Sequence, residues 1–164
     1  MSSLANAVRT RVSEECLTTR CQKEGCKVSL PRIGGFPDRQ RPYVVIDMDH
    51  SESPASQDEQ RCDFLFVGEC ENQGWVVPLE LKRGQPTANE IVHQLRAGAS
   101  IAEDIVPRNA EAKFRPVAAY GGELKRHQLK LFRYKANRIE FRGQREGVRL
   151  IRCGVSLKHA LKSP

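Results

Sequence analysis

The chain has 164 residues, 39% of them hydrophobic, which suits a single domain with a sizeable core. No apolar run approaches the roughly 18 residues of a transmembrane helix, and the first residues lack the apolar segment of a signal peptide. We therefore expect a cytoplasmic protein that is not embedded in a membrane. The sequence has no Walker loop, GxGxxG or GxSxG motif, which leaves nucleotide-driven and serine-hydrolase functions without support.

The formal net charge of +7 is unevenly distributed along the chain. Residues 113–164 carry 14 Lys or Arg and three Glu, a net charge of +11, whereas residues 1–112 carry a net charge of −4. A strongly basic segment indicates a polyanionic partner, and nucleic acid is the commonest one.

Residues 3–16 are expected to form the first helix. Leu4, Val8 and Val12 recur at the spacing of one helix face, and Ser2 or Ser3 is a suitable N-cap.

Three cysteines then follow at even spacing, at Cys16, Cys21 and Cys26. They could hold a structural zinc ion with a distant fourth ligand such as Cys153 or His50, because structural zinc takes four tetrahedral ligands. The alternative is that they are free, partly buried thiols, since an intracellular setting disfavours disulfides.

The first core strand is predicted at residues 43–48, a continuous apolar run. Asp47 and Asp49 follow on one face of it. They could assist a metal site, or they could simply be the acidic end of a strand that leads into a loop.

Two further strands are predicted at residues 62–67 and 75–82, joined by a polar turn. Asp63 begins the first of them, and Glu80 and Lys82 share one face near the end of the second. If the strands pair as a hairpin, two carboxylates and an ammonium group converge at one end of the sheet.

This arrangement suits the hydrolysis of phosphodiester bonds. Mg²⁺ or Mn²⁺ is typically held by one or two carboxylates, here Asp63 and Glu80, together with water and phosphate oxygens. Lys82 could orient the attacking water or stabilise developing negative charge. The alternative is that these are solvated charges at strand ends, which contribute little.

Asp63 before Phe-Leu-Phe-Val, and then Glu80-Leu81-Lys82 before a helix, resemble the motif of the PD-(D/E)XK nuclease superfamily, the restriction-endonuclease-like fold. The resemblance implies that Asp63 and Glu80 bind a divalent metal and that Lys82 assists the water. It also implies a core of order α-β-β-β-α-β. Cys62 stands where the family has its proline.

The next helix is expected to run from about residue 87 to 106. Thr87 is a suitable N-cap with Glu90 three residues later, and Pro107 ends the helix. The same resemblance implies that Gln94 faces the active site, although Ala97 stands where RecB-like members have a tyrosine.

The basic region is expected to begin after a core strand at residues 114–120. A helix is predicted within residues 123–134, and a hairpin is predicted from segments 139–142 and 148–150 around the turn QREG. The residues expected to bind phosphate are Arg83, which follows Lys82, and five residues of the basic region: Lys125, Arg126, Arg142, Arg145 and Arg149.

Together these observations predict one α/β domain spanning residues 1–164. A mixed central sheet flanked by helices would occupy residues 1–121, and residues 122–164 would form a basic hairpin extension. The predicted activity is metal-dependent hydrolysis of DNA, with Asp63, Glu80, Lys82 and Gln94 in the site. Cleavage of both strands would require a homodimer or a larger complex. The alternatives are a non-catalytic nucleic-acid-binding or assembly subunit with the same fold, and a small zinc-stabilised interaction protein.

Overall fold

A mixed β-sheet forms the centre of the protein, for which a computed structural model describes residues 3–32, 37, 40–56 and 60–162. The sheet follows the order β1-β4-β5-β6-β8-β11, and β7 pairs with one end of β6. Its strands are β1 (Leu17–Thr18), β4 (Tyr43–Asp47), β5 (Phe64–Cys70), β6 (Gln73–Lys82), β7 (Lys113–Phe114), β8 (Val117–Tyr120) and β11 (Arg149–Arg152). Strands β4, β5 and β6 are antiparallel, whereas β6, β8 and β11 are parallel.

Helices and short hairpins surround this sheet. The helical elements are α1 (Leu4–Arg9), η1 (Glu14–Cys16), α2 (Ala88–Ile105), α3 (Arg126–Phe132), η3 (Lys135–Asn137) and α4 (Leu157–Leu161). The hairpins are β2 (Cys21–Lys23) with β3 (Cys26–Val28), and β9 (Ile139–Phe141) with β10 (Gln144–Glu146). The predicted fold class, one α/β domain with a mixed sheet flanked by helices, is confirmed.

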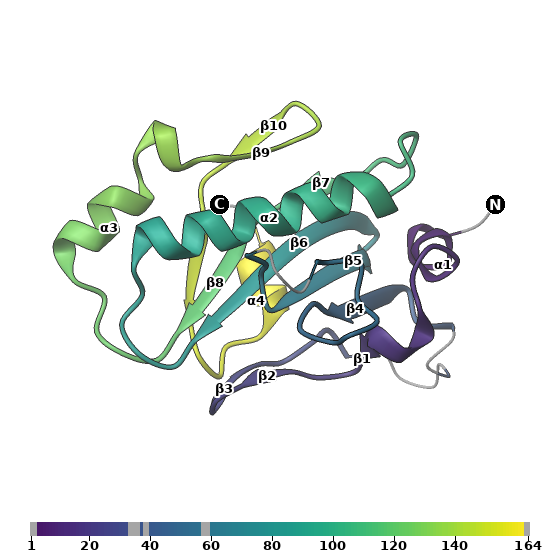
Figure 1. Cartoon of the computed structure of the whole chain (residues 1–164), viewed down its shortest axis with the longest axis horizontal. Helices are drawn as coiled ribbons and strands as arrows, with labels where there is room; N and C mark the ends of the chain where they lie inside the picture. The colour runs from purple at the N-terminus through teal and green to yellow at the C-terminus, as the bar shows by residue number, and fades with distance from the viewer. Residues whose placement is uncertain (1–2, 33–36, 38–39, 57–59, 163–164) are drawn as a thin grey trace.

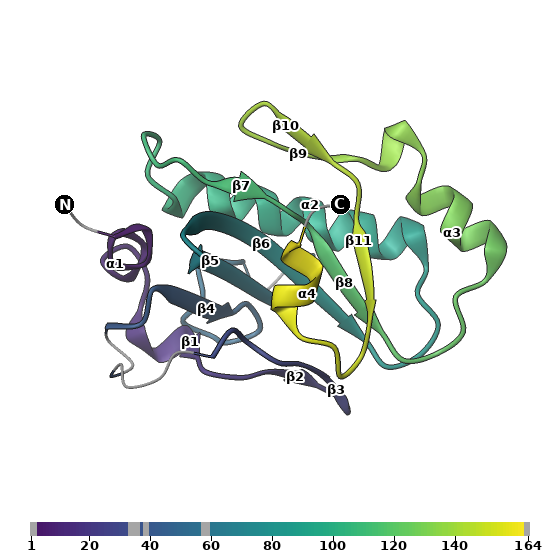
Figure 2. The same ribbon diagram turned by 180° about the vertical axis from the view of Figure 1, so that it is seen from behind.

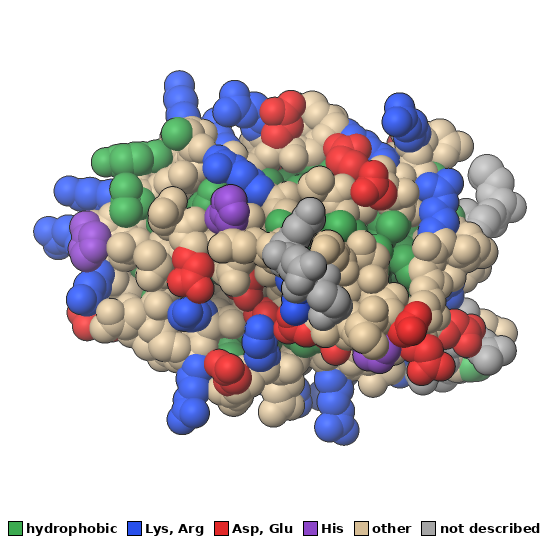
Figure 3. All heavy atoms as spheres, viewed as in Figure 1, with side chains coloured by type: hydrophobic (Ala, Val, Ile, Leu, Met, Phe, Trp, Pro, Cys, Tyr) green, Lys and Arg blue, Asp and Glu red, His purple; other side chains and the backbone are tan. Residues whose placement is uncertain are grey.

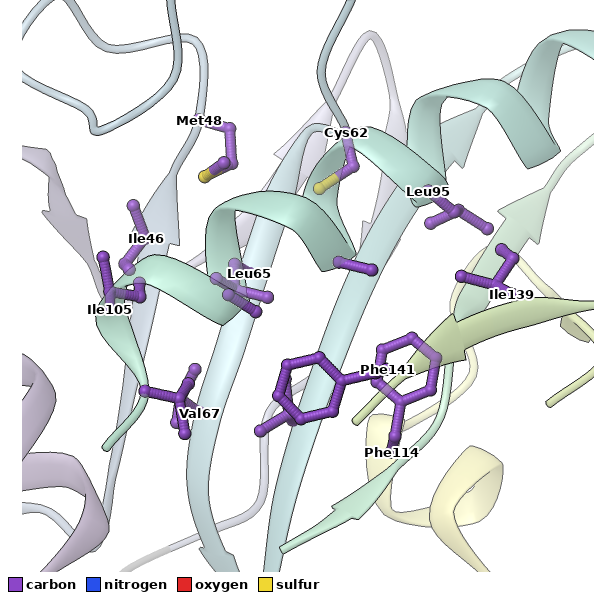
Figure 4. Close-up of a cluster of buried hydrophobic side chains, with 14 of the residues drawn as sticks. Ile46, Met48, Cys62, Leu65, Val67, Leu95, Ile105, Phe114, Ile139 and Phe141 are labelled. Carbon is purple, nitrogen blue, oxygen red and sulfur yellow. The ribbon is translucent and has the colours of Figure 1, made fainter. Parts of the chain in front are cut away.

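Each face of the sheet has its own layer of buried side chains. Helix α2 crosses one face (Figure 1), where its Leu95 and Ile105 belong to one buried cluster with Leu65 and Val67 of β5 (Figure 4). Helix α4 covers the opposite face, as seen from behind in Figure 2. The alternation of side chains along each strand divides the apolar residues of β5 and β6 between these two layers.

The first helix is shorter than predicted. Helix α1 ends at Arg9, and the chain resumes as the short turn η1. Ser3 is the N-cap, and Ser2 lies outside the described residues. The Ser13 hydroxyl accepts the N–H of Glu15 at 3.2 Å, which starts a separate turn in place of a continuous helix.

Helix α2 begins after Thr87, as predicted, but the capping box does not form. Thr87 makes no side-chain cap hydrogen bond. The Ala88 N–H donates instead to the side-chain oxygen of Gln128 in α3, at 2.8 Å. A residue of another helix therefore accepts the hydrogen bond of a terminal N–H group, a role that the Thr87 side chain was expected to fill.

The predicted pairing of the C-terminal hairpin is wrong. Segment 139–141 pairs with 144–146 through a two-residue turn at Arg142 and Gly143, both with positive φ. Residues 149–152 join the central sheet as β11, parallel to β8. A tight turn with both central residues at positive φ matches the twist of a hairpin, and glycine adopts that conformation without steric cost. The segment expected to be an extension thus supplies the last strand of the sheet.

Candidate active site

The strand register brings Asp63 opposite Glu80. Phe64 of β5 pairs with Leu79 of β6, so Asp63, one residue before β5, lies across from Glu80. The side chain of Asp63 is 3% exposed, and Glu80 as a whole is 4% exposed. These are the buried charged residues of the described core, and buried carboxylates require partners or protons. The juxtaposition expected from the sequence is therefore present, and both groups are desolvated.

Asp63 is held by a backbone N–H group and by a cation. Its Oδ2 accepts the backbone N–H of Leu81 at 2.8 Å, and its Oδ1 forms an ion pair with the ammonium of Lys23. Lys23 lies in β2 and also contacts Asp49 Oδ2 at 3.2 Å. Asp49 in turn pairs with Arg61 at 2.9 Å. Asp63 is therefore held from two sides, by a backbone donor and by a cation.

Glu80 is less completely satisfied. Its Oε2 atom is buried and has no hydrogen-bond partner among the described residues. Burial raises the pKa of Glu80 well above its ordinary value, and a hydrogen bond with Asp63 and the Asp63 charge raise it further. Glu80 therefore has a raised pKa and one buried oxygen without a hydrogen-bond donor among the described residues.

Lys82 lies on the same face of β6 as Glu80 but turns toward the helix. Its Nζ atom is 3.6 Å from Glu90 Oε1, in the first turn of α2. The side chains of Lys82 and Glu90 are 39% and 48% exposed. An exposed pair of this kind contributes little stability and reorients readily, so Lys82 can reach toward the carboxylates without a large cost.

Gln94 lies at the level of Glu80, because α2 approaches β6 at one point before Gln94 and at another point after it. Glu90 contacts Lys82, and a Cβ atom on Gly98 would lie 2.9 Å from Cβ of Pro78. Four helical residues advance about 6 Å and two strand residues about 6.6 Å, so Gln94 and Glu80 fall at the same level between these points. The half-buried Gln94 is therefore placed over the carboxylate pair.

Cys62, which stands where the family that the motif resembles has proline, packs beneath the same helix (Figure 4). Its thiol is fully buried, and a Cβ on Gly98 would approach its sulfur to 2.5 Å. Burial raises the pKa of the Cys62 thiol, so it stays protonated. Its role is to fill space under α2.

The cysteines that were predicted to bind one zinc ion, Cys16, Cys21, Cys26 and Cys153, do not come together in the structure. Cys26 and Cys153 form a disulfide across 127 residues of sequence. Cys16 and Cys21 are buried free thiols, and they belong to the layers on opposite faces of the sheet. These four residues therefore do not form a common cluster, and the alternative expectation of a free thiol is not met at Cys26.

The described residues contain no group of three or more His, Cys, Asp or Glu arranged to hold a metal ion. The carboxylates that come together are Asp63 and Glu80, and Lys23 stands beside them as the cation. Asp49 reaches this cluster through Lys23, whereas Asp47 accepts the backbone N–H of Asp49 at 3.0 Å.

Among the predicted phosphate-binding residues, Arg142 has a structural role. Its guanidinium pairs with Glu103 at 3.0 Å and donates to the carbonyls of Val106 and Pro107. It thus caps the C-terminal end of α2, whose last carbonyls lack partners within the helix. The other five residues of that set are exposed or half-exposed: Arg83, Lys125, Arg126, Arg145 and Arg149.

Lys23 is the site residue that the sequence did not reveal. The one local signal is a tight turn at Glu24 and Gly25, both with positive φ, which predicts a short hairpin around it. Nothing in that pattern indicates that this hairpin reaches a carboxylate 40 residues away.

No family model, curated protein or solved structure matches the chain. The resemblance to PD-(D/E)XK nucleases therefore rests on the residues of the motif and on their arrangement. Among the helices that the structure describes, none has an apolar stretch long enough to cross a bilayer.

Proposed function

We propose that the protein is a divalent-metal-dependent nuclease whose site contains Asp63, Glu80, Lys82 and Gln94. The observation that carries this proposal is the buried Oε2 atom of Glu80, which has no hydrogen-bond donor among the described residues and lies beside the carboxyl group of Asp63. Unpaired buried oxygens are rare in proteins and require an explanation. A bound cation would supply one.

The donor set fits Mg²⁺ or Mn²⁺. Both carboxylates provide hard oxygen ligands, and such ions are often held by two carboxylates with water and phosphate oxygens. When bound there, the metal supplies Lewis-acid activation of water and offsets charge on the phosphate. Asp63 and Glu80 would hold it.

The protein's own groups divide the remaining tasks. The Leu81 N–H fixes the orientation of Asp63. Lys82, paired loosely with Glu90, can turn to orient water or to stabilise negative charge. Gln94, at the level of Glu80, can donate or accept a hydrogen bond there. DNA is the proposed substrate because the C-terminal half is strongly basic.

A non-catalytic nucleic-acid-binding module is the second candidate, and the Lys23–Asp63 ion pair favours it. An ammonium group already neutralises the carboxylate without metal. In that case the cluster would stabilise the fold, and the basic surface alone would carry the function.

Cleavage assays separate the two. Plasmid, linear duplex, single-stranded DNA and RNA would be incubated with the purified protein in Mg²⁺, Mn²⁺ or EDTA. Asp63→Asn, Glu80→Gln and Lys82→Met should each abolish metal-dependent cleavage, whereas Asp104→Asn, a change to an exposed acid on α2, should not. Absence of cleavage in every metal, with salt-sensitive binding retained by all variants, would reject the nuclease in favour of the binding module.

A further inference from the structure

An arginine-lined hollow lies outside the carboxylate site. Its volume is about 460 Å³, and five arginines line it: Arg115, Arg133, Arg138, Arg145 and Arg149. They come from the β7–β8 connection, from the α3–β9 connection and from β10 and β11. On the face that carries α2, Lys and Arg side chains surround α3 at the left of Figure 3. We refer to this feature as the arginine hollow.

The arginines of the hollow are not neutralised by the protein. In the part of the chain that the structure describes, Arg133, Arg138, Arg145 and Arg149 form no ion pair with a carboxylate. Glu146 is the single acidic residue in the lining. Clustered like charges repel and lower the stability of the folded state, so their retention indicates an anionic ligand.

Arg115 is held firmly in the wall. Its guanidinium lies 5.3 Å from the centre of the Trp75 ring and donates to the carbonyls of Ala160 at 3.1 Å and Lys162 at 3.0 Å. Burial lowers the pKa of Arg115, and the charge of nearby Arg149 lowers it further. The hollow thus has one fixed cation, and four others at its rim that are free to turn toward a ligand.

The side chains that line the hollow indicate which anion would bind there. Guanidinium groups match the oxygens of phosphate, often with two parallel hydrogen bonds. The one aromatic residue of the lining, Phe132, is buried in the core, so no exposed ring offers a platform for a base. Gly147 leaves the rim open, since a Cβ there would meet no atom within 4 Å. The hollow fits a chain of phosphates better than a nucleotide base.

The sheet register links the hollow to the carboxylates. Arg149 pairs with Val117, and Val117 pairs with Leu79, the neighbour of Glu80. Two strand spacings amount to about 10 Å between the backbones of β6 and β11. Side chains alternate between the two faces of the sheet, so Arg149 lies on the α4 side with Leu79, whereas Glu80 lies on the α2 side with Lys82.

We propose that the arginine hollow binds the sugar-phosphate backbone of a nucleic-acid strand and thereby anchors the substrate of the proposed nuclease. This proposal deepens the proposed nuclease function and rests on it, since the bound strand is a substrate only if the protein cleaves it. Binding itself does not depend on cleavage.

The test measures binding in EDTA, where cleavage cannot occur. Fluorescently labelled single-stranded and duplex DNA would be titrated with the unaltered protein, with the double variant Arg145→Gln/Arg149→Gln and with Arg133→Gln. The double variant should bind at least tenfold more weakly at 100 mM salt, and the slope of log affinity against log salt should fall by about two, close to one for each lost phosphate contact. Arg108→Gln, a change to an exposed arginine after α2, is the matched control and should bind unchanged.

One further arm tests the chemistry of the ligand. Because binding is measured in EDTA, a failure of the nuclease proposal leaves this one standing. Poly-glutamate should compete weakly, because carboxylates are spaced differently from phosphates. Equal binding by the double variant and Arg108→Gln, with both variants folded by circular dichroism, would overturn the proposal. So would competition by poly-glutamate as strong as that by DNA.

Discussion

Lys23 and Asp63 form an ion pair that joins the β2–β3 hairpin to the start of β5, although 40 residues separate them in sequence. Lys23 thereby holds positive charge beside the carboxylate on which the proposed metal would bind. An ammonium group and a divalent cation cannot both neutralise one carboxylate oxygen, so they are expected to compete.

Replacing Lys23 with Met should therefore lower the stability of the protein without metal and increase the stabilisation that a bound metal gives. Loss of the cation leaves Asp63 buried and unpaired, and should lower the free energy of unfolding in EDTA by about 1–3 kcal/mol. The loss is smaller than for a fully buried pair, because the Lys23 side chain is 39% exposed. Mn²⁺ should then raise the melting temperature of Lys23→Met more than that of the unaltered protein.

Lys27→Met provides the control, since Lys27 lies exposed in the same hairpin. Thermal melts with and without Mn²⁺ compare the three proteins. If Lys23→Met and Lys27→Met melt alike in both conditions, the ion pair has no influence on stability or metal binding.

Lys82 and Glu90 offer a second prediction. If Lys82 acts in the site, Lys82→Met should slow cleavage by about 10²–10⁴-fold. Glu90→Gln removes the partner that draws the ammonium toward α2, and should leave the cleavage rate within about threefold or raise it. Single-turnover rates in Mn²⁺ measure both. An equal loss in the two variants would mean that the pair itself, rather than a mobile Lys82, is what the site requires.

Gly98 is expected to be intolerant of any side chain. A Cβ there would lie 2.5 Å from the sulfur of Cys62 and 2.9 Å from Cβ of Pro78. Gly98→Ala should therefore destabilise the protein by about 1–3 kcal/mol, even though alanine is the better helix former. Thermal denaturation should show a melting temperature lower by several degrees.

Two further variants give this experiment its control. Cys62→Ala in the Gly98→Ala background removes the sulfur and should recover part of the lost stability. Gly147→Ala, at a position with open space, should have little effect. A Gly98→Ala protein as stable as the parent would mean that α2 does not pack this closely on β6.

The disulfide between Cys26 and Cys153 yields a prediction that needs no assumption about function. Under denaturing, non-reducing conditions a thiol reagent should titrate the four free cysteines, and after reduction it should titrate all six. Reduction, or Cys26→Ser with Cys153→Ser, should lower the free energy of unfolding by about 2–4 kcal/mol, because the bond closes a long loop. Six reactive thiols in the unreduced, denatured protein would contradict the pairing.

Much of the carboxylate site could be predicted because it is local. The β5–β6 hairpin closes through a two-residue turn at Glu71 and Asn72, both with positive φ. Side-chain alternation then determines which residues of each strand share a face. Asp63 and Glu80 meet for these reasons, and the end of α2 likewise follows from Pro107, just beyond the C-cap residue Val106.

The sequence by itself thus determined the strand and helix pattern around residues 62–106 and the meeting of Asp63 with Glu80, because turns, caps and periodicity act between near neighbours. Only the tertiary structure decided that Lys23 reaches Asp63, that Arg142 caps α2 and that residues 149–152 complete the sheet. These contacts join segments far apart in the chain. Their partners are selected by how the layers pack, and no local pattern encodes that choice.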